Sequence, residues 1–203
     1  MWALVQDGTV TKTFNYAKGF VLNDTQYPKD IFTKWTTAEK EAIGIYEVIE
    51  DKTNYKNSEY YINTNSTIVF ANNQVTESWG TATPKRLEDE NAVDEDGNNI
   101  LEDGVQVINY GLKTEKKRIV KDQAAGLLAK TDWYVVKATE VADYTVPADI
   151  TTYRAAVRTR SNEMETAIDN AADVDALEAL YTYTEQSDGT STRPLGEWPE
   201  EVI

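Results

Sequence analysis

The sequence predicts an α+β protein, in which a β-rich N-terminal domain precedes a small helical C-terminal module of three to four helices. Three observations support this fold class. Short apolar segments separated by turn-forming residues fill residues 1–86, which is typical of strands. Acidic residues dominate 87–110, which predicts a solvated linker or an exposed hairpin. Apolar residues then recur with a helical period, so the helical module and an extended C-terminal tail are placed at 111–203.

Short turns delimit the predicted strands of the first domain. Asp7-Gly8 is a two-residue hairpin signal between strands at 2–6 and 9–14. Asn23-Asp24-Thr25 predicts a second turn, between 19–22 and 26–27. Further strands are expected at 45–49, 60–62, 67–70 and 75–79, with Asn72-Asn73 as a tight turn between the last two.

One short helix is predicted within this domain. Thr36 and Glu39 have the spacing of a capping box, in which each residue satisfies a backbone N–H of the other. Gly44 stands where a C-terminal glycine would end the helix.

The first two helices of the C-terminal module are predicted from their apolar positions. The first begins near Lys113 and carries one apolar stripe, formed by Ile119, Val120, Ala124, Leu127 and Leu128. The second is short, and its buried positions are expected to be Trp133, Val136 and Val141.

Two more helices complete the module. Pro147 suits the first turn of the third helix, and Asp149 in that turn favours the helix dipole. Asp173 is expected to cap the fourth. The apolar positions of these two helices are Ile150, Tyr153, Val157, Met164, Ile168 and Ala171, followed by Val174, Leu177, Leu180 and Tyr181.

Composition excludes several classes of function. The net charge of −15 argues against binding to nucleic acid or to an anionic membrane. The chain has no cysteine and no histidine, which removes thiolate chemistry, the commonest general base and the commonest metal ligand. No apolar run approaches the roughly 20 residues of a membrane span, and the N-terminus does not resemble a signal peptide. We expect no catalytic residue and no cofactor.

An acidic turn in the connecting segment is the only candidate metal site. Asp94, Asp96, Gly97 and Asp103 match half of a calcium-binding loop. With Gly97 as the central glycine, the first ligand position falls on Ala92, which has no ligand atom. A solvated acidic turn is therefore the favoured interpretation, and no metal is expected.

A basic cluster stands out in this acidic chain, formed by Lys113, Lys116, Lys117, Arg118 and Lys121. Such a run is usually the solvated face of an amphipathic helix, and Glu115 and Asp122 dilute its charge. The functional alternative is contact with an acidic surface of another subunit, for which Lys117 and Arg118 are the candidate residues.

Aromatic residues give the remaining candidates. Trp133 and Tyr153 are expected in the core, whereas their neighbours Tyr134 and Arg154 are candidates for partner contact. Trp198 lies in a proline-flanked tail and is expected to dock on its own domain or on a neighbour. Exposed aromatics among Tyr55, Tyr60, Tyr61 and Trp79 could stack on host-surface glycans, but cross-strand packing explains the same pattern.

Several segments carry a resemblance to a known family. They are Gly111-Leu112-Lys113-Thr114, Leu127-Leu128-Ala129, Thr131-Asp132-Trp133, Tyr153-Arg154-Ala155-Ala156-Val157 and Gly196-Glu197-Trp198-Pro199. In order and spacing they resemble the C-terminal region of tail proteins of tailed bacteriophages, in particular the tail assembly chaperone and tail-fibre-assembly-like families. Ala3 to Gly8, Tyr27-Pro28 and Glu39 to Tyr46 resemble the front of such proteins less specifically.

The resemblance implies a non-enzymatic structural component of a phage tail, near the baseplate or the fibre attachment. It implies location in the virion tail, and in the host cytoplasm during assembly. Its partners would be other tail proteins, and it would form a homo-oligomer within a symmetric assembly. One alternative is a tail or tail-fibre assembly chaperone, although the long β-rich front and the acidic connector depart from that pattern. A second alternative is a glycan-binding tail adhesin.

Overall fold

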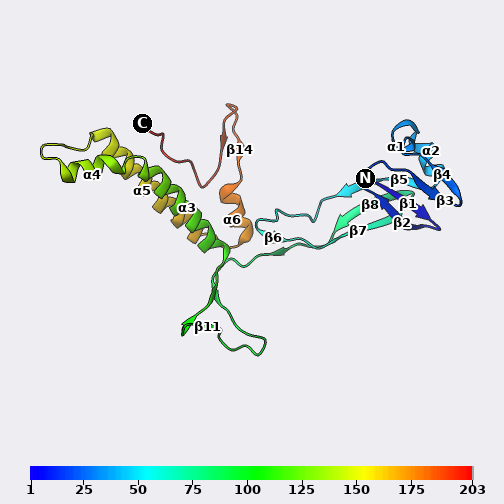
Figure 1. The fold of residues 1–203 in the computed structure, drawn as a ribbon, viewed down its shortest axis with the longest axis horizontal. Helices are drawn as coiled ribbons and strands as arrows, with labels where there is room; N and C mark the ends of the chain where they lie inside the picture. Colours follow the sequence, from blue (N-terminus) through cyan, green and yellow to red (C-terminus); the bar gives the residue numbers. More distant parts are fainter. Residues whose placement is uncertain (203) are drawn as a thin grey trace. The chain divides into compact units, whose positions relative to one another are not determined.

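The computed structural model describes residues 1–202 and contains two compact units, Met1–Thr83 and Pro84–Ile203. The first unit consists mainly of strands, whereas the long helices lie in the second (Figure 1). The predicted α+β class, with a β-rich part before a helical part, is therefore confirmed. None of the helices within residues 1–202 is long and apolar enough to cross a membrane.

A five-stranded sheet forms the centre of the first unit. Its strands are β1 (Trp2–Gln6), β2 (Thr9–Phe14), β5 (Ile45–Asp51), β7 (Ser66–Ala71) and β8 (Gln74–Trp79), in the order β2-β1-β5-β8-β7. β5 runs parallel to β8, and the other neighbouring strands are antiparallel. The edge strands β2 and β7 lie close to each other, so the sheet is curled.

Two-residue turns with a left-handed backbone connect the antiparallel strands. The φ angles are 50° at Asp7 and 74° at Gly8 between β1 and β2, and 50° at Asn72 and 59° at Asn73 between β7 and β8. Asn, Asp and Gly tolerate this conformation best, which is why these dipeptides form hairpins. Both predicted hairpins are confirmed. A third joins β3 (Phe20–Leu22) to β4 (Thr25–Tyr27), with a turn one residue shorter than predicted.

Two short helices, α1 (Ile31–Lys34) and α2 (Thr37–Ala42), complete the first unit together with a small ladder of β6 (Tyr61–Ile62) and β9 (Thr83–Pro84). The predicted capping box is present at α2, where the backbone N–H of Thr36 donates to the Glu39 carboxylate at 2.8 Å. Gly44 follows α2 with a φ of 80°, and a Cβ there would overlap the carbonyl oxygen of Val5. The sequence does not predict α1, because a single turn is too short to show a helical period.

The two faces of the sheet bury separate apolar clusters, because successive residues of a strand point to opposite sides. Leu4 lies on one face, where it packs with Phe14, Phe20, Ile31, Phe32 and Ile45. Its neighbour Ala3 lies on the other face, with Val48 and Val75. The second cluster is completed by half-buried side chains, among them Tyr46, Ile68 and Phe70.

Four helices form the body of the second unit: α3 (Leu112–Ala129), α4 (Asp132–Glu140), α5 (Ala148–Asp169) and α6 (Val174–Tyr181). α3 and α5 lie side by side over much of their length (Figure 1). The predicted helix starts are confirmed, since Pro147 precedes α5 and the Asp173 carboxylate accepts the N–H of Ala176 at 2.8 Å. The largest fully buried side chains of this unit are Val120, Val157, Met164, Ile168 and Leu177.

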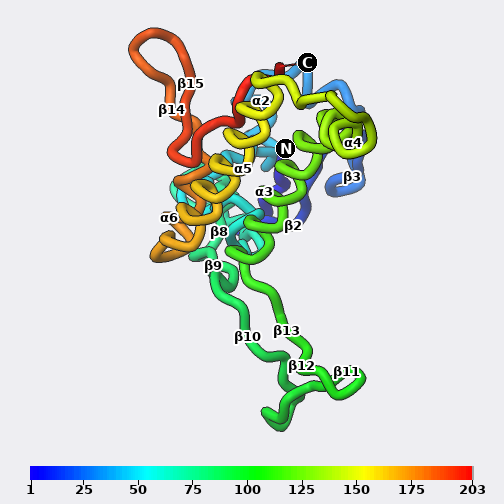
Figure 2. Tube along the Cα trace, turned by 90° about the vertical axis from the view of Figure 1, so that its left-hand side faces the viewer, coloured from blue at the N-terminus to red at the C-terminus, as the bar shows by residue number. Residues whose placement is uncertain are grey.

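A projecting arm, residues 87–110, precedes these helices (Figure 2). β10 (Glu90–Asn91) pairs with β13 (Ile108–Asn109) to form its stem. Farther out, β11 (Leu101–Glu102) and β12 (Val105–Gln106) form a second hairpin around Asp103 and Gly104, whose φ angles are 51° and 80°. The acidic segment is thus built of paired strands.

The C-terminal tail of the second unit begins with a hairpin of β14 (Thr184–Glu185) and β15 (Ser191–Thr192). Residues 193–202 then return along the helices as an extended segment, which we call the strap. The backbone N–H of Leu195 donates to the carbonyl oxygen of Leu180 at 2.9 Å, and Leu195 is buried.

Candidate interaction surfaces

The junction between α3 and α4 is built around a buried arginine. Arg154 on α5 is 8% exposed. Its guanidinium donates to the carbonyl oxygen of Leu128 at 2.8 Å and to the hydroxyl of Thr131 at 2.7 Å, and it pairs with the Asp132 carboxylate at 2.8 Å. Two segments that carry the resemblance, Thr131-Asp132-Trp133 and the run that begins at Tyr153, therefore contact each other.

This arrangement corrects the expected placement of two residues. The sequence predicts that Arg154 lies away from the core, because Tyr153 occupies the neighbouring position, but both side chains are buried. Arg154 reaches the helix junction and binds it, so its charge is occupied within the module. The prediction that Trp133 lies in the core is wrong, since its side chain is 52% exposed. At the start of α4, it is the neighbouring Thr131 and Asp132 that face the module, where they bind Arg154.

Two other positions predicted to be buried are exposed as well. Val136 on α4 is 51% exposed, and Val141, directly after the helix, is 48% exposed. Tyr134 is half-buried, with its ring centroid 4.2 Å from that of Trp133. Of the stripe predicted on α3, Val120 and Ala124 are buried, whereas Ile119 is exposed. α4 therefore presents an apolar face that the described part of the module leaves uncovered.

The basic cluster on α3 is paired with acids of the same unit. Lys117 and Lys121 reach across to Asp169 and Glu165 on α5, at 2.6 and 3.2 Å. The bond from Lys117 to Asp169 raises the pKa of the Lys117 ammonium group.

The other members of the cluster are engaged as well. Lys113 pairs with Glu88 at 2.6 Å, and Arg118 pairs along its own helix with Glu115 and Asp122. Lys116 is buried, with its ammonium group 4.4 Å from the centroid of the Tyr181 ring. The cluster therefore joins the parts of the second unit to one another.

Trp198 docks on its own unit. Its indole N–H donates to the side-chain oxygen of Gln123 at 3.1 Å, and its ring packs against the buried cluster of Ala124, Tyr153 and Val157. The strap is also fixed by Arg160, which donates to the carbonyl oxygen of Glu197 at 2.9 Å. Trp198 was expected to dock either on its own domain or on a neighbouring chain, and in the structure it docks on its own domain.

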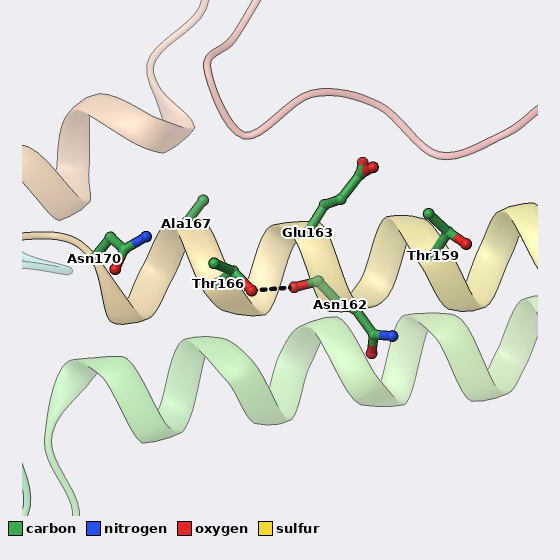
Figure 3. A pocket seen from close by; sticks show the side chains of 6 residues that line it. All are labelled: Thr159, Asn162, Glu163, Thr166, Ala167 and Asn170. Carbon is green, nitrogen blue, oxygen red and sulfur yellow. Dashed lines mark hydrogen bonds between the residues drawn. The ribbon is translucent and has the colours of Figure 1, made fainter.

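A broad hollow of about 520 Å³ lies over α5 (Figure 3). Its lining comes from one helix, with Thr159, Asn162, Glu163, Thr166, Ala167 and Asn170. The hydroxyl of Thr166 donates to the backbone oxygen of Asn162 at 2.8 Å, as the dashed line shows. The Glu163 carboxylate at its edge accepts a hydrogen bond from Arg160 at 2.8 Å.

The acidic turn of the arm is ordered by its own hydrogen bonds. The Asp94 carboxylate accepts the backbone N–H groups of Asp96 and Asn98 at 3.0 and 2.8 Å. These bonds lower the pKa of Asp94, with that from Asn98 as the main cause. Within residues 1–202, no group of three acidic side chains is arranged to hold a metal ion.

The aromatic residues of the first unit are packed mainly against one another. Tyr60 and Tyr61 are buried, and Tyr55 lies edge-on to the half-buried Trp79 with ring centroids 5.2 Å apart. Of the two explanations that the sequence offers for these aromatics, packing within the unit and stacking on glycans, this arrangement corresponds to packing.

The arm carries exposed apolar side chains that the sequence did not single out as a surface. Val93, Leu101 and Val105 are 51%, 59% and 69% exposed, and Ile100 and Tyr110 are exposed as well. The available signal was the presence of eight large apolar residues beside eight acidic ones in the segment 87–110. Together with α4, the arm is a candidate surface for protein–protein contact.

Comparisons of the chain with protein-family models, with curated proteins and with solved structures found no match.

Proposed function

We propose that this protein is a non-enzymatic structural component of a bacteriophage tail, placed near the baseplate or the fibre attachment, which acts by binding other tail proteins. The observation that carries the proposal is the exposed apolar surface of the second unit, on α4 and on the arm. Trp133 and Val136 stand outward from α4, and Leu101 and Val105 stand outward from the arm. Exposed apolar residues in this number favour contact with other chains.

The paired charges of the helical module support a structural role. Lys117, Lys121 and Arg154 hold helices together by ion pairs with acids of the same unit. A module braced in this way offers a rigid base for partner contacts. The resemblance of 111–202 to tail proteins of tailed bacteriophages supplies the context of the proposal. The presence of two compact units supports binding to two partners, one for each unit.

Quantitative mass spectrometry of purified phage particles tests this function. A structural component is expected in every particle at a defined copy number, such as a multiple of three or six, because tail parts are symmetric. Absence from particles, together with presence in infected cells, would contradict the structural role and favour the assembly chaperone.

A glycan array separates these two roles from the adhesin. An adhesin would bind host-surface glycans and would lose that binding in Trp79→Ala. We expect no such binding, because Trp79 and Tyr55 pack against each other.

A further inference from the structure

The arm has a fixed shape, because side-chain and backbone hydrogen bonds tie its outer hairpin to its stem. The side-chain amide of Gln106 donates to the carbonyl oxygens of Ala92 and Val107, at 3.0 and 2.8 Å. The backbone N–H of Ile100 donates to the Ala92 oxygen, and that of Val107 to the Ile100 oxygen, both at 2.9 Å. Ala92, at this junction, is buried. A preformed surface loses little conformational entropy on binding.

A hollow of about 470 Å³ runs along β12 and β13. Its apolar lining comes from Val105, Val107, Ile108 and Tyr110, and its acidic lining from Glu102 and Asp103. Val105 is 69% exposed, the most exposed of the large apolar side chains of the described chain. The hollow thus combines aliphatic surface with two carboxylates.

The charge of the arm has one sign. Residues 87–110 include eight acidic residues and no lysine or arginine. At the base, Glu88 and Glu90 pair with Lys113 and Arg86. Farther out, within residues 1–202, no ion pair involves Glu95, Asp96, Glu102 or Asp103. The outer part of the arm is therefore complementary to a basic surface.

We propose that the arm docks on another protein chain, and that the hollow along β12 and β13 receives a lysine or arginine side chain flanked by aliphatic residues. A lysine or arginine has an apolar stem and a cationic head, which match the aliphatic lining and the two carboxylates. The inference rests on the proposed function, because it names the kind of partner that such a tail component binds.

A second copy of the chain is a poorer match for the arm. Each copy has a net charge of −15, so two copies repel each other at this acidic element. The basic cluster of α3, which would be the natural partner on another copy, is engaged within its own unit, for example by Lys117 with Asp169 and by Lys113 with Glu88.

An array of short synthetic peptides of varied sequence tests the docking proposal with the purified full-length protein. Bound peptides are expected to share a lysine or arginine next to aliphatic residues. Val105→Ser removes the aliphatic contact and keeps the charge, whereas the double variant Glu102→Gln, Asp103→Asn removes the charge and keeps the shape. Each is expected to weaken binding at least about threefold, the effect of losing one modest contact.

Matched controls lie in the first unit. Ile49→Ser removes an apolar side chain that is 49% exposed, and Glu47→Gln removes an exposed carboxylate. Both are expected to bind the selected peptides like the unchanged protein. Circular dichroism of all variants checks that the fold is retained.

Three results would overturn the docking proposal. The first is equal binding by the arm variants and the unchanged protein. The second is weaker binding by the double variant Glu102→Gln, Asp103→Asn but not by Val105→Ser, which would show that the peptides bind only by unspecific attraction to acidic residues. The third is self-association that the arm variants abolish in sedimentation, which would identify a second copy as the occupant.

The peptide experiment is independent of the particle experiment. A chain that is absent from purified particles, but selects basic aliphatic peptides through its arm, would contradict the tail role and leave the docking inference standing. A chain that is present in particles at a defined copy number, but whose arm selects no peptide, would support the tail role and contradict the docking inference.

Discussion

Arg154 and Thr131 are joined by a hydrogen bond of 2.7 Å inside the helical module, although the sequence suggests that the arginine is a surface residue. The same guanidinium binds the Leu128 carbonyl oxygen at the end of α3 and the Asp132 carboxylate at the start of α4. One side chain of α5 therefore fixes the corner between two other helices, and the direction in which α4 points depends on it.

Replacing Arg154 with methionine is expected to destabilise the module. The variant keeps much of the apolar stem but removes the charged donor from the Thr131 hydroxyl and the Leu128 carbonyl oxygen, which stay bonded to each other at 2.9 Å. Loss of the hydrogen bonds to this charged group is expected to lower the free energy of unfolding by about 1.5–3 kcal/mol. Urea unfolding monitored by circular dichroism measures the change. Arg118→Met is the control, because Arg118 pairs only at the surface of its own helix and its loss should change stability little. Equal effects of the two variants would contradict the role of Arg154.

Replacing Trp133 with alanine is expected to change the free energy of unfolding by less than about 1 kcal/mol, because half of this side chain already faces solvent. Ile168→Ala in the same module is the comparison, since Ile168 is 0% exposed and its truncation should cost about 2–5 kcal/mol. Thermal unfolding of both variants provides the measurement. A large loss of stability in Trp133→Ala would place this side chain in the core after all.

Replacing Gly196 with alanine is expected to loosen the strap. Gly196 has a φ of 78°, and a Cβ at this position would overlap the guanidinium of Arg160, which also binds the Glu197 carbonyl oxygen. Hydrogen exchange of the Leu195 amide should become faster, because this amide is bonded to the Leu180 carbonyl oxygen only while the strap is seated.

Gly189→Ala separates backbone strain from the loss of contact with Arg160. Gly189 has a φ of 81°, and a Cβ added there would meet no atom within 4 Å, so its substitution costs only the left-handed backbone strain of about 1–2 kcal/mol. It should leave exchange at Leu195 unchanged. Similar exchange at Leu195 in both variants would show that Arg160 does not hold the strap.

The turn at Asp94 is expected to open in acid. Hydrogen bonds from Asn98 and Asp96 lower the pKa of Asp94 in the folded chain relative to the unfolded chain. The stabilisation they provide is therefore complete above the unfolded pKa, near pH 4, and is lost as the pH falls through the folded value. The amide resonance of Asn98 in NMR spectra should follow this titration. Asp94→Asn should remove the pH dependence, and a resonance that moves equally in that variant would assign it to another group.

Local signals in the sequence predicted much of the first unit. Asp7-Gly8 and Asn72-Asn73 form the expected turns because their residue types tolerate a left-handed backbone, and Thr36 with Glu39 forms the expected capping box. These features depend on only a few neighbouring residues, so they can be recognised without knowledge of the rest of the chain.

The features that failed depend on distant residues. Apolar spacing placed Trp133 and Val136 on one side of a helix, but spacing alone does not reveal whether another element covers that side. The burial of Arg154 was invisible to a hydrophobic pattern, because its partners lie 23 and 26 residues away along the chain. For the arm, the exposed hairpin was one of the two predicted alternatives, but the acidic composition did not reveal which residues pair, such as Glu90 with Asn109.

This pairing of Glu90 with Asn109 has a consequence for the evolution of the molecule. The chain leaves the body of the second unit and returns to it at neighbouring points, so everything beyond the first rung of the stem is a self-contained insertion. Such a segment can be lengthened, shortened or exchanged without moving the start of α3, because loop length changes the free energy of closure only slowly. Related chains can therefore share the helical body and differ in the arm, so that specificity diverges while the scaffold remains the same.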